Sequence, residues 1–461
     1  MIDIFDKYLT AIEDTDPIKY TGTVTKVQGM LIESQGPQSV IGEVCQIMIP
    51  RGTGAVYAEV VGLKGRIVQL MAYEDVQGLE IGCKVIACGN VLDVPVGNNL
   101  LGRVLDGMGK AYDNKGEIVS ATHYPALASP PDPMKRKPIK QRIVTGVRAI
   151  DALLPCGSGQ RLGIFAGSGV GKSTLLGMIA RNTNADINVI ALIGERGREV
   201  VDFIENDLGK EGLAKSVVVV ATSDRPPIAR LRGAYVATAV AEYFRDQGKN
   251  VMLMFDSVTR FAKAQREIGL AIGEPPAQRG YTPSVFEILP KLLERSGTSD
   301  RGSITGFYTV LVDGDDMDEP IADTVRGILD GHIVLSRKLA NRYHYPAIDI
   351  LSSISRLSNR VSGPFSQKSA ALIKRLMAAY DSIEDMINAG AYQKGSNPEV
   401  DLAISKHNDI EMFLNQDVND KAPLEDTLKK LSVLAETEIP PGECSLNIGE
   451  SRTKKLQEQE T

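Results

Sequence analysis

The fold of this chain is decided by the stretch Ala166-Gly167-Ser168-Gly169-Val170-Gly171-Lys172-Ser173-Thr174. The apolar run before it, residues 162–165, is typical of a buried strand, and residues 174–180 after it are typical of a helix. Glycines let the backbone turn tightly, so that several N–H groups point at one anion, and the helix N-terminus adds partial positive charge. This context predicts a phosphate-binding loop between a strand and a helix.

The polar residues of this loop have distinct expected roles toward a nucleoside triphosphate. Lys172 is predicted to reach the β- and γ-phosphates, and the Ser173 hydroxyl to ligate Mg²⁺. The first position holds Ala166 where the strict pattern has glycine, which costs little if that residue keeps a negative φ. An accidental Gly-rich turn is the alternative, and Gly-Lys-Ser after a strand disfavours it.

The composition is that of an ordinary globular protein. The chain has 461 residues, too many for one core, so we expect roughly two to four domains. Apolar residues make up 43% and charged residues 24%, and the net charge of −6 gives no reason to expect a general affinity for nucleic acid. No apolar stretch is long enough to span a bilayer, and the acidic N-terminus is unlike a signal peptide, so we expect a cytoplasmic protein.

The cysteines and histidines predict neither disulfides nor a metal site. The five cysteines are an odd number without CxxC spacing, and reduced thiols are expected. The four histidines are far apart in the sequence and lack metal-ligand spacing, so structural roles are expected for them.

The N-terminal part of the chain changes its pattern near residue 20. Apolar residues at helical spacing between 4 and 12 predict a short amphipathic helix, which docks either on a partner or on the domain that follows. Short β-rich runs broken by glycines, from about 20 to 89, predict a small closed barrel.

The rest of the chain divides into an α/β region and a helical region. From about 145 to 356, nearly continuous apolar runs alternate with helical stretches, as in parallel strands covered on both faces. Beyond residue 367 the strand patterns stop, and residues 370–388 and 400–415 are typical of helices. The polar tail from about 436 is expected to be disordered.

A carboxylate ends one of the predicted parallel strands. Residues 252–256 form an apolar run that finishes at Asp256. Ligands of open α/β sheets bind beyond the carboxyl ends of the strands, so Asp256 is predicted to hold Mg²⁺, directly or through water. A helix-capping aspartate before Ser257 is the alternative.

A second carboxylate follows the strand predicted to end at Ile193. Residues 194–199 read Gly-Glu-Arg-Gly-Arg-Glu, and Glu195 in this place can orient and partly deprotonate an attacking water. Arg196 is expected either to steady Glu195 or to contact phosphate. The alternative is the solvated, charged start of a helix.

A third candidate, Arg356, lies where the sheet region ends. An arginine that stabilises charge on a transferring phosphoryl group can come from a separate polypeptide. A surface arginine is equally compatible with the local sequence, so both interpretations stay open at this point.

With these residues identified, the chain resembles the hexameric ATPases related to the catalytic subunit of rotary ATP synthases. Within them it looks like the type III secretion ATPases, and most closely the flagellar protein-export ATPases. The resemblance covers roughly residues 20–420. Its most specific segments are residues 162–174, 280–286, 312–320 and 330–337.

The resemblance implies an α/β fold in which a RecA-like P-loop ATPase core lies between an N-terminal β-barrel and a C-terminal helical domain. The boundaries we expect are residues 1–93 for the N-terminal helix and barrel, 94–364 for the ATPase domain, 365–435 for the helical domain and 436–461 for the tail.

The resemblance also implies the roles of single residues, with ATP and Mg²⁺ as cofactors. Lys172 would be the phosphate lysine, Ser173 and Asp256 the magnesium residues, and Glu195 the residue that activates water. Arg356 would act in the neighbouring subunit's site. Tyr345 occupies the place of an aromatic residue beside the adenine, with a packed loop tyrosine as the alternative.

Glu195 and Arg356 lie on the same chain, so identical subunits could build complete sites at every interface, which favours a homohexamer. The partners that the resemblance implies are a dimeric regulator at the N-terminal region, a coiled-coil stalk protein, the export gate and chaperone–substrate complexes. It places the protein in the cytoplasm, peripheral at the inner face of the cytoplasmic membrane.

Three other functions remain to be compared with flagellar export. The ATPase of a virulence-type secretion system shares the same chemistry. A non-catalytic nucleotide-binding ring subunit is disfavoured by the carboxylate at position 195. A nucleic-acid motor would need an aromatic and basic platform in the barrel, whereas residues 20–90 contain few aromatics and no dense Lys/Arg cluster, so no nucleic-acid partner is expected.

Overall fold

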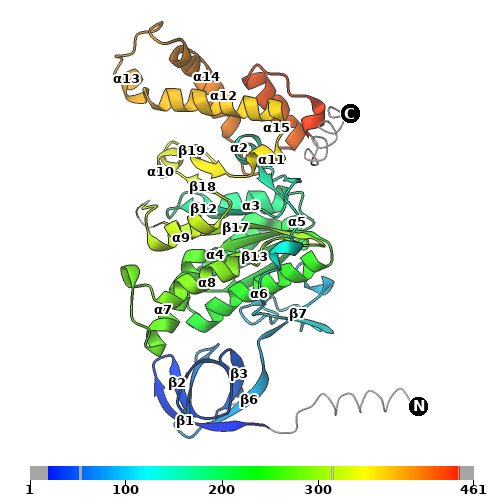
Figure 1. The fold of residues 1–461 in the computed structure, drawn as a ribbon, viewed down its shortest axis with the longest axis vertical. Coiled ribbons are helices and arrows are strands. Elements are labelled where there is room, and N and C mark those ends of the chain that lie inside the picture. Colours follow the sequence, from blue (N-terminus) through cyan, green and yellow to red (C-terminus); the bar gives the residue numbers. More distant parts are fainter. Residues whose placement is uncertain (1–18, 51–53, 313, 315, 445, 447–461) are drawn as a thin grey trace, which may run out of the picture.

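The computed structural model describes residues 19–50, 54–312, 314, 316–444 and 446. Three parts follow one another along the long axis, with a barrel at one end, a large sheet in the middle and helices at the other end (Figure 1). The predicted amphipathic helix at residues 4–12 lies outside the described residues, as does most of the predicted tail. Within the described ranges, no helix is long and apolar enough to cross a membrane.

The N-terminal strands close into the predicted barrel, in the order β1-β2-β5-β4-β3-β6. Side chains alternate between its two surfaces, and Val24, Ile47, Leu70 and Val85 fill the interior with at most 1% of their surface exposed. The six strands are β1 (Thr21–Gln28), β2 (Leu31–Gln35), β3 (Glu43–Met48), β4 (Ala55–Lys64), β5 (Ile67–Ala72) and β6 (Lys84–Val91).

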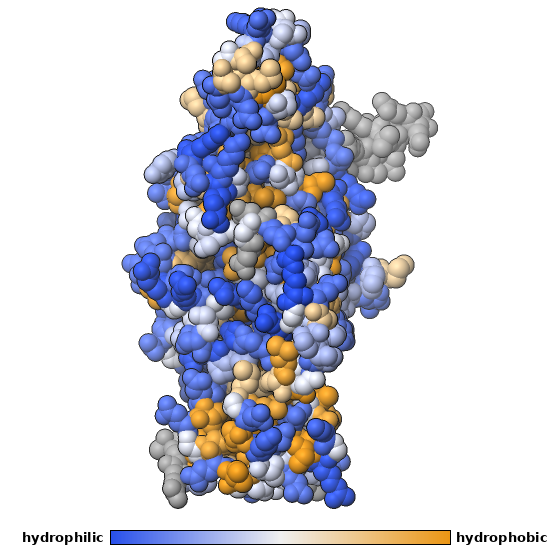
Figure 2. Space-filling view, turned by 90° about the vertical axis from the view of Figure 1, so that its left-hand side faces the viewer, coloured by the Kyte–Doolittle hydropathy of each residue, from blue (hydrophilic) through white to orange (hydrophobic). Residues whose placement is uncertain are grey.

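The outside of the barrel is unusually apolar. Figure 2 shows apolar side chains gathered at the barrel end of the molecule. Large exposed apolar residues of this part include Met30, Val40, Ile41, Leu63 and Ile81. Contiguous apolar surface of this kind commonly marks a site of protein association.

The middle part is a nine-stranded sheet of order β19-β18-β12-β17-β15-β13-β14-β8, with β16 paired to β17. Strands β8 to β18 of this order are parallel, except β16, while β19 runs antiparallel at one edge. Their bounds are β8 (Val104–Asp106), β12 (Arg161–Ala166), β13 (Ile187–Ile193), β14 (Ser216–Ala221), β15 (Asn250–Asp256), β16 (Gly297–Thr298), β17 (Ser303–Leu311), β18 (Gly331–Leu335) and β19 (Ile348–Ser355).

Helices cover both faces of this sheet. Every residue of β13 is buried, and its alternate side chains belong to two different apolar clusters. One cluster includes α6 and α7 and the other α3, which explains why the strands appear as continuous apolar runs. The helices of this region are α2 (Arg148–Leu153), α3 (Lys172–Asn182), α4 (Gly197–Asp202), α5 (Gly209–Ala214), α6 (Pro227–Asp246), α7 (Val258–Ile272), α8 (Pro283–Leu293), α9 (Pro320–Ile328), α10 (Arg337–Asn341) and α11 (Ser358–Val361).

The reversal of β19 separates two ends of the sheet. The last residue of β12, Ala166, pairs with Leu335 of β18, which in turn pairs with Ile348 at the start of β19. The end of β19 lies beside the amino end of β18, where Ser355 pairs with Gly331. A segment that follows β19 therefore starts about four strand residues, or about 13 Å, from the level at which β12 ends.

The C-terminal part is helical and is clamped to the core. It contains α12 (Pro364–Asp381), α13 (Glu384–Asn388), α14 (Pro398–Leu414) and α15 (Leu424–Leu434), of which α15 was not predicted. Arg148 at the start of α2 donates from Nε to the carbonyl oxygen of Phe413 at 2.9 Å and from a guanidinium N–H to that of Asn415 at 2.7 Å. These bonds satisfy carbonyls that the end of α14 leaves unpaired.

A buried ion pair joins the barrel to the central part. Glu59 of β4 is 1% exposed, and it accepts hydrogen bonds from Arg232 Nε of α6 at 2.6 Å and from the Tyr73 hydroxyl at 2.6 Å. Because both charges are removed from water, each depends on the other for its stability. Two smaller sheets complete the fold, β7 (Asp93–Val96) with β9 (Thr122–Pro125) and β10 (Arg142–Ile143) with β11 (Cys156–Gly157).

Candidate active site

The predicted phosphate loop connects β12 to α3, as the sequence pattern indicates. Gly169 and Gly171 have φ of 79° and 88°, in the left-handed region that favours glycine. No side chain among the described residues caps the N-terminus of α3, so its first N–H groups are available to an anion. Ala166 ends β12 in extended conformation, so the departure from the strict pattern causes no strain there.

Two carboxylates from neighbouring strands meet the loop lysine. Lys172 Nζ hydrogen-bonds to Asp256 Oδ1, at the end of β15, and lies 3.5 Å from Glu195 Oε1, just beyond β13. The Thr309 hydroxyl of β17 donates to Asp256 Oδ1 at 2.8 Å. Helix capping is done by Ser257, which accepts from the N–H of Arg260, so Asp256 is not the cap of α7. The parallel sheet thus brings together Lys172 and Asp256, which are 84 positions apart in the sequence.

Burial sets the protonation of this cluster. It raises the pKa of Glu195 to about 7; Lys172 opposes the shift, Asp256 and a hydrogen bond with Glu199 add to it, and Arg260 opposes it. For Lys172, burial lowers the pKa, but Asp256 and then Glu195 outweigh it, so the pKa is raised. A carboxyl group with a pKa near neutrality is suited to accept a proton.

The two arginines near Glu195 differ from expectation. Arg196, predicted to steady Glu195 or contact phosphate, is 79% exposed, and its ion pair is with Glu199 at 3.7 Å. Arg260 of α7, which the sequence analysis missed, packs against the backbone of Gly194, and its Nε is buried without a hydrogen-bond partner among the described residues. Its position four residues after Asp256, in the first turn of the next helix, was the available signal.

Tyr345 approaches the loop from the side of the helical part. A β-carbon on Gly171 would lie 3.5 Å from the Tyr345 ring, so the ring borders the phosphate loop. Its side chain is 38% exposed, and its carbonyl oxygen accepts from the N–H of Gln416 at 2.8 Å. A partly exposed aromatic ring beside the loop can stack on a base.

Arg356 lies apart from this cluster. It follows the end of β19, beside the amino end of β18, and its side chain is exposed. Its guanidinium lies 3.5 Å from the carbonyl oxygen of Arg326. Its N–H donates to the carbonyl oxygen of Asp330, at the start of β18. The structure therefore brings Lys172, Glu195, Asp256 and Tyr345 together beyond the carboxyl ends of the parallel strands. It leaves Arg356 near the amino end of β18.

Comparison with known proteins agrees with this geometry. Three family models match: the beta-barrel domain of the ATP synthase alpha/beta family over residues 24–89, its nucleotide-binding domain over 146–355, and the T3SS EscN ATPase C-terminal domain over 364–433. The chain is 59% identical to the flagellum-specific ATP synthase of Treponema pallidum, covering 95% of this chain and 99% of that protein. The chain belongs to the flagellar and type III secretion ATPase family.

Other relatives of this export ATPase lie in both branches. The flagellum-specific ATP synthase of Bacillus subtilis is 54% identical over 93% of this chain and 98% of its own, and the type 3 secretion system ATPase of Xanthomonas euvesicatoria is 51% identical over 89% and 93%. The assembled ATPase EscN of enteropathogenic E. coli matches with a TM-score of 0.85 at 46% identity, over 90% of this chain and all of that one. EscN in complex with its central stalk EscO gives a TM-score of 0.83.

These findings confirm several predictions. The resemblance to flagellar export ATPases and the three-part fold are confirmed. Family membership makes the chain a nucleotide-using, ATP-hydrolysing enzyme. The roles of single residues and the exact domain boundaries stay predictions.

Proposed function

We propose that this export ATPase hydrolyses Mg²⁺·ATP to energise or prime protein export through a flagellar type III secretion apparatus. The observation that carries the proposal is the convergence of Lys172, Glu195 and Asp256 beyond the carboxyl ends of the parallel strands β12, β13 and β15. The higher identity to the two flagellar relatives supports the flagellar branch, with a virulence-type system as the alternative.

The residues present fit a triphosphate and a magnesium ion. Apart from Gly169 itself and its two chain neighbours, no described residue has an atom within 4 Å of a β-carbon built on Gly169, so the loop has room for phosphate oxygens. Asp256 and the Ser173 hydroxyl supply the hard oxygen ligands that Mg²⁺ prefers, and would hold it. When bound, the metal neutralises charge that develops on the phosphates.

Each residue of the chain then has one task. Lys172 binds the β- and γ-phosphates, and Glu195 orients a water and accepts its proton. Tyr345 lies against the adenine, and Arg260 adds positive charge beside Glu195. For Arg196, a contact with phosphate stays a prediction, and in this structure its side chain is exposed to solvent.

The position of Arg356 supports a ring of identical copies, with the site completed by the neighbour. Arg356 lies near the amino end of β18, whereas the phosphate loop follows the carboxyl end of β12. In the proposed ring, one copy therefore supplies the loop and the next copy supplies the guanidinium. This head-to-tail contact closes into a homohexamer. The assembled state of EscN and its complex with a central stalk support an oligomer and a stalk partner. The apolar surface of the barrel provides further area for association.

The remaining parts of the proposal rest on the family resemblance. They are a dimeric regulator at the N-terminal region, the export gate and chaperone–substrate complexes as partners, and a cytoplasmic location at the inner face of the membrane. The domain boundaries at residues 93, 364 and 435 belong to the same proposal.

The water-activating role is tested with Glu195→Gln. This variant should lose ATP turnover by at least about a hundredfold while it retains ATP binding, because the amide keeps the shape but accepts no proton. Glu205→Gln, at an exposed position ten residues further along the chain, is the matched control and should remain active. Undiminished hydrolysis by Glu195→Gln would remove Glu195 from this role.

The shared site is tested by mixing Glu195→Gln with Arg356→Ala, each inactive alone. In randomly mixed rings about one interface in four combines an intact Glu195 with an intact Arg356, so about a quarter of wild-type turnover should return. Arg360→Ala, an exposed neighbour, should be active by itself. Absence of rescue in verified mixed rings would contradict a neighbour-supplied arginine.

A further inference from the structure

The loop that carries Tyr345 is braced by the helical part of the chain. It connects α10 to β19, and Tyr343 within it has φ of 59°, a left-handed conformation that is strained for a tyrosine. Strained backbone persists where surrounding contacts determine it. The contacts that hold this loop therefore decide where the Tyr345 ring lies.

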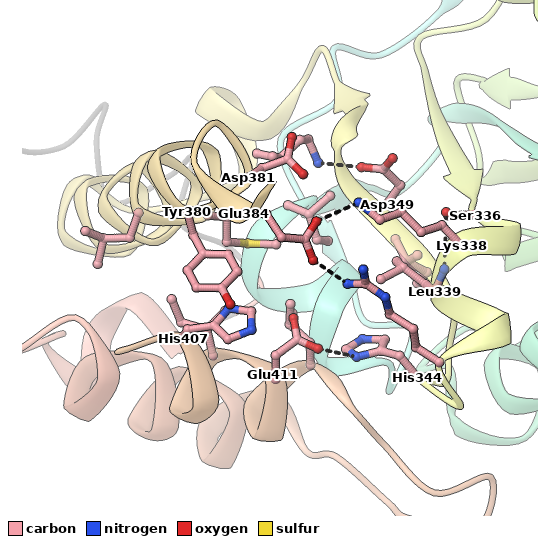
Figure 3. A pocket seen from close by; sticks show the side chains of 18 of the residues that line it. Ser336, Lys338, Leu339, His344, Asp349, Tyr380, Asp381, Glu384, His407 and Glu411 are labelled. Carbon is pink, nitrogen blue, oxygen red and sulfur yellow. Dashed lines mark hydrogen bonds and ion pairs between the residues drawn. The ribbon is translucent and has the colours of Figure 1, made fainter. Parts of the chain in front are cut away.

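The first brace is a hydrogen bond between the His344 ring and Glu411 of α14. His344 is 6% exposed, and its Nδ1 lies 2.8 Å from Glu411 Oε2 (Figure 3). The hydrogen bond from His344 is the main reason that the pKa of Glu411 is lowered, although burial opposes it. Glu411 is thus held as a carboxylate that accepts a hydrogen bond from the ring of His344, the residue before Tyr345.

The second brace fixes the end of α14. Gln416, 2% exposed, donates its N–H to the carbonyl oxygen of Tyr345, and its side chain accepts from the N–H of Arg148 at 2.8 Å and donates to the carbonyl oxygen of Gly146 at 2.9 Å. The turn after α14 is therefore attached to the core. The loop lies between this fixed turn and the Glu411 side chain.

The surrounding cavity contains two further ion pairs, both to Glu384 of α13. Lys338 of α10 and Arg342, the first residue after α10, donate to Glu384 at 2.8 and 2.7 Å, in the same cavity of about 140 Å³ (Figure 3). These pairs tie α10 and the start of the loop to α13. The contact with Glu411 is made by His344, the residue that directly precedes Tyr345.

We propose that the His344–Glu411 pair positions the Tyr345 ring for the adenine base, so that α14 of the helical part sets the affinity for ATP. The inference rests on the proposed function, since it takes Tyr345 as the base-stacking residue. His344 and Glu411 are positioning residues that touch neither the phosphates nor the carboxylate cluster. Their loss should therefore change KM and leave kcat nearly intact.

The test uses the full chain with Glu411→Gln. This change should raise KM for ATP about fivefold with kcat within about twofold, because a charge-assisted hydrogen bond is replaced by a weaker one. Inorganic tripolyphosphate, which has no base, should keep its inhibition constant as a competitor. Glu399→Gln on the same helix removes an exposed pair with Arg375 and is the matched control, expected to leave KM unchanged.

A second pair of variants keeps the test independent of Glu411. His344→Ala should reproduce the rise in KM, whereas His344→Asn, whose amide can donate from a place near Nδ1, should restore most of the affinity. Thermal unfolding of each variant separates a local effect from loss of the fold.

A double variant decides the mechanism. In a Tyr345→Ala background, Glu411→Gln should raise KM by less than about twofold further, since the ring that it positions is absent. A full additional fivefold rise there, an equal loss of tripolyphosphate binding, or an unchanged KM in Glu411→Gln would overturn the inference. Failure of the proposed function is distinct: wild-type protein would then hydrolyse no ATP, or would do so equally well after Lys172→Ala.

Discussion

Raising the pH should switch on catalysis over an interval that the burial of Glu195 determines. A general base must be ionised to accept the proton of water, and burial raises the pKa of Glu195 from 4.5 to about 7. The shift corresponds to about 3 kcal/mol of preference for the neutral acid in the folded site. The active form therefore accumulates as the pH rises, and activity is lost as the pH falls through about 7.

The expected size of the effect follows from that value. With a pKa near 7, about 1% of Glu195 is ionised at about pH 5, half at about pH 7 and roughly 90% at about pH 8. The value of kcat/KM should thus rise about a hundredfold over this range. An unshifted glutamate would give a flat profile above about pH 6.

The assay is steady-state phosphate release at several pH values, with Glu199→Ala as the second enzyme. ATP itself titrates in this range, but its titration is the same for both enzymes. The Glu199 carboxylate accepts a hydrogen bond from protonated Glu195, which adds to the effect of burial on the pKa of Glu195, so the variant's profile should move to lower pH. A flat wild-type profile, or identical profiles for the two enzymes, would refute the reasoning.

Two further predictions concern stability and the phosphate loop. Glu59→Gln leaves the guanidinium of Arg232 buried without its counter-charge, which should lower the free energy of unfolding by about 3–5 kcal/mol and reduce the thermal midpoint. Glu287→Gln, which removes an exposed pair with Lys291, should leave the midpoint unchanged. Equal midpoints for the two variants would contradict this prediction. Gly171→Ala places a β-carbon at φ of 88°, which costs about 1–2 kcal/mol, so kcat/KM should fall about tenfold. Gly197→Ala, with open space around its β-carbon, is the control, and a similar loss there would discount the strain.

The sequence predicted the parts of the site that depend on local pattern. The phosphate loop and Asp256 were recognisable because a buried parallel strand appears as a continuous apolar run and its ligands follow the strand end. Glu195 was recognisable for the same reason. These residues converge because parallel strands share one carboxyl edge.

Features that depend on long-range register were less accessible. The reversal of β19, which moves Arg356 to the other edge, leaves no mark in local periodicity. The outward direction of Arg196 and the inward one of Arg260 depend on how α4 and α7 pack, not on their composition. The three-residue strand β8 and the helix α15 were missed because the first is too short to show a pattern and the second ends close to the expected tail.

The antiparallel course of β19 gives the molecule a polarity. In the ring that we propose, one copy supplies the phosphate loop and the next supplies the Arg356 guanidinium, so the copies repeat in one direction around the ring. The number of catalytic centres would then equal the number of chains. A copy that lacks both Glu195 and Arg356 would silence its own centre and that of one neighbour, which makes such an allele dominant in a mixed population.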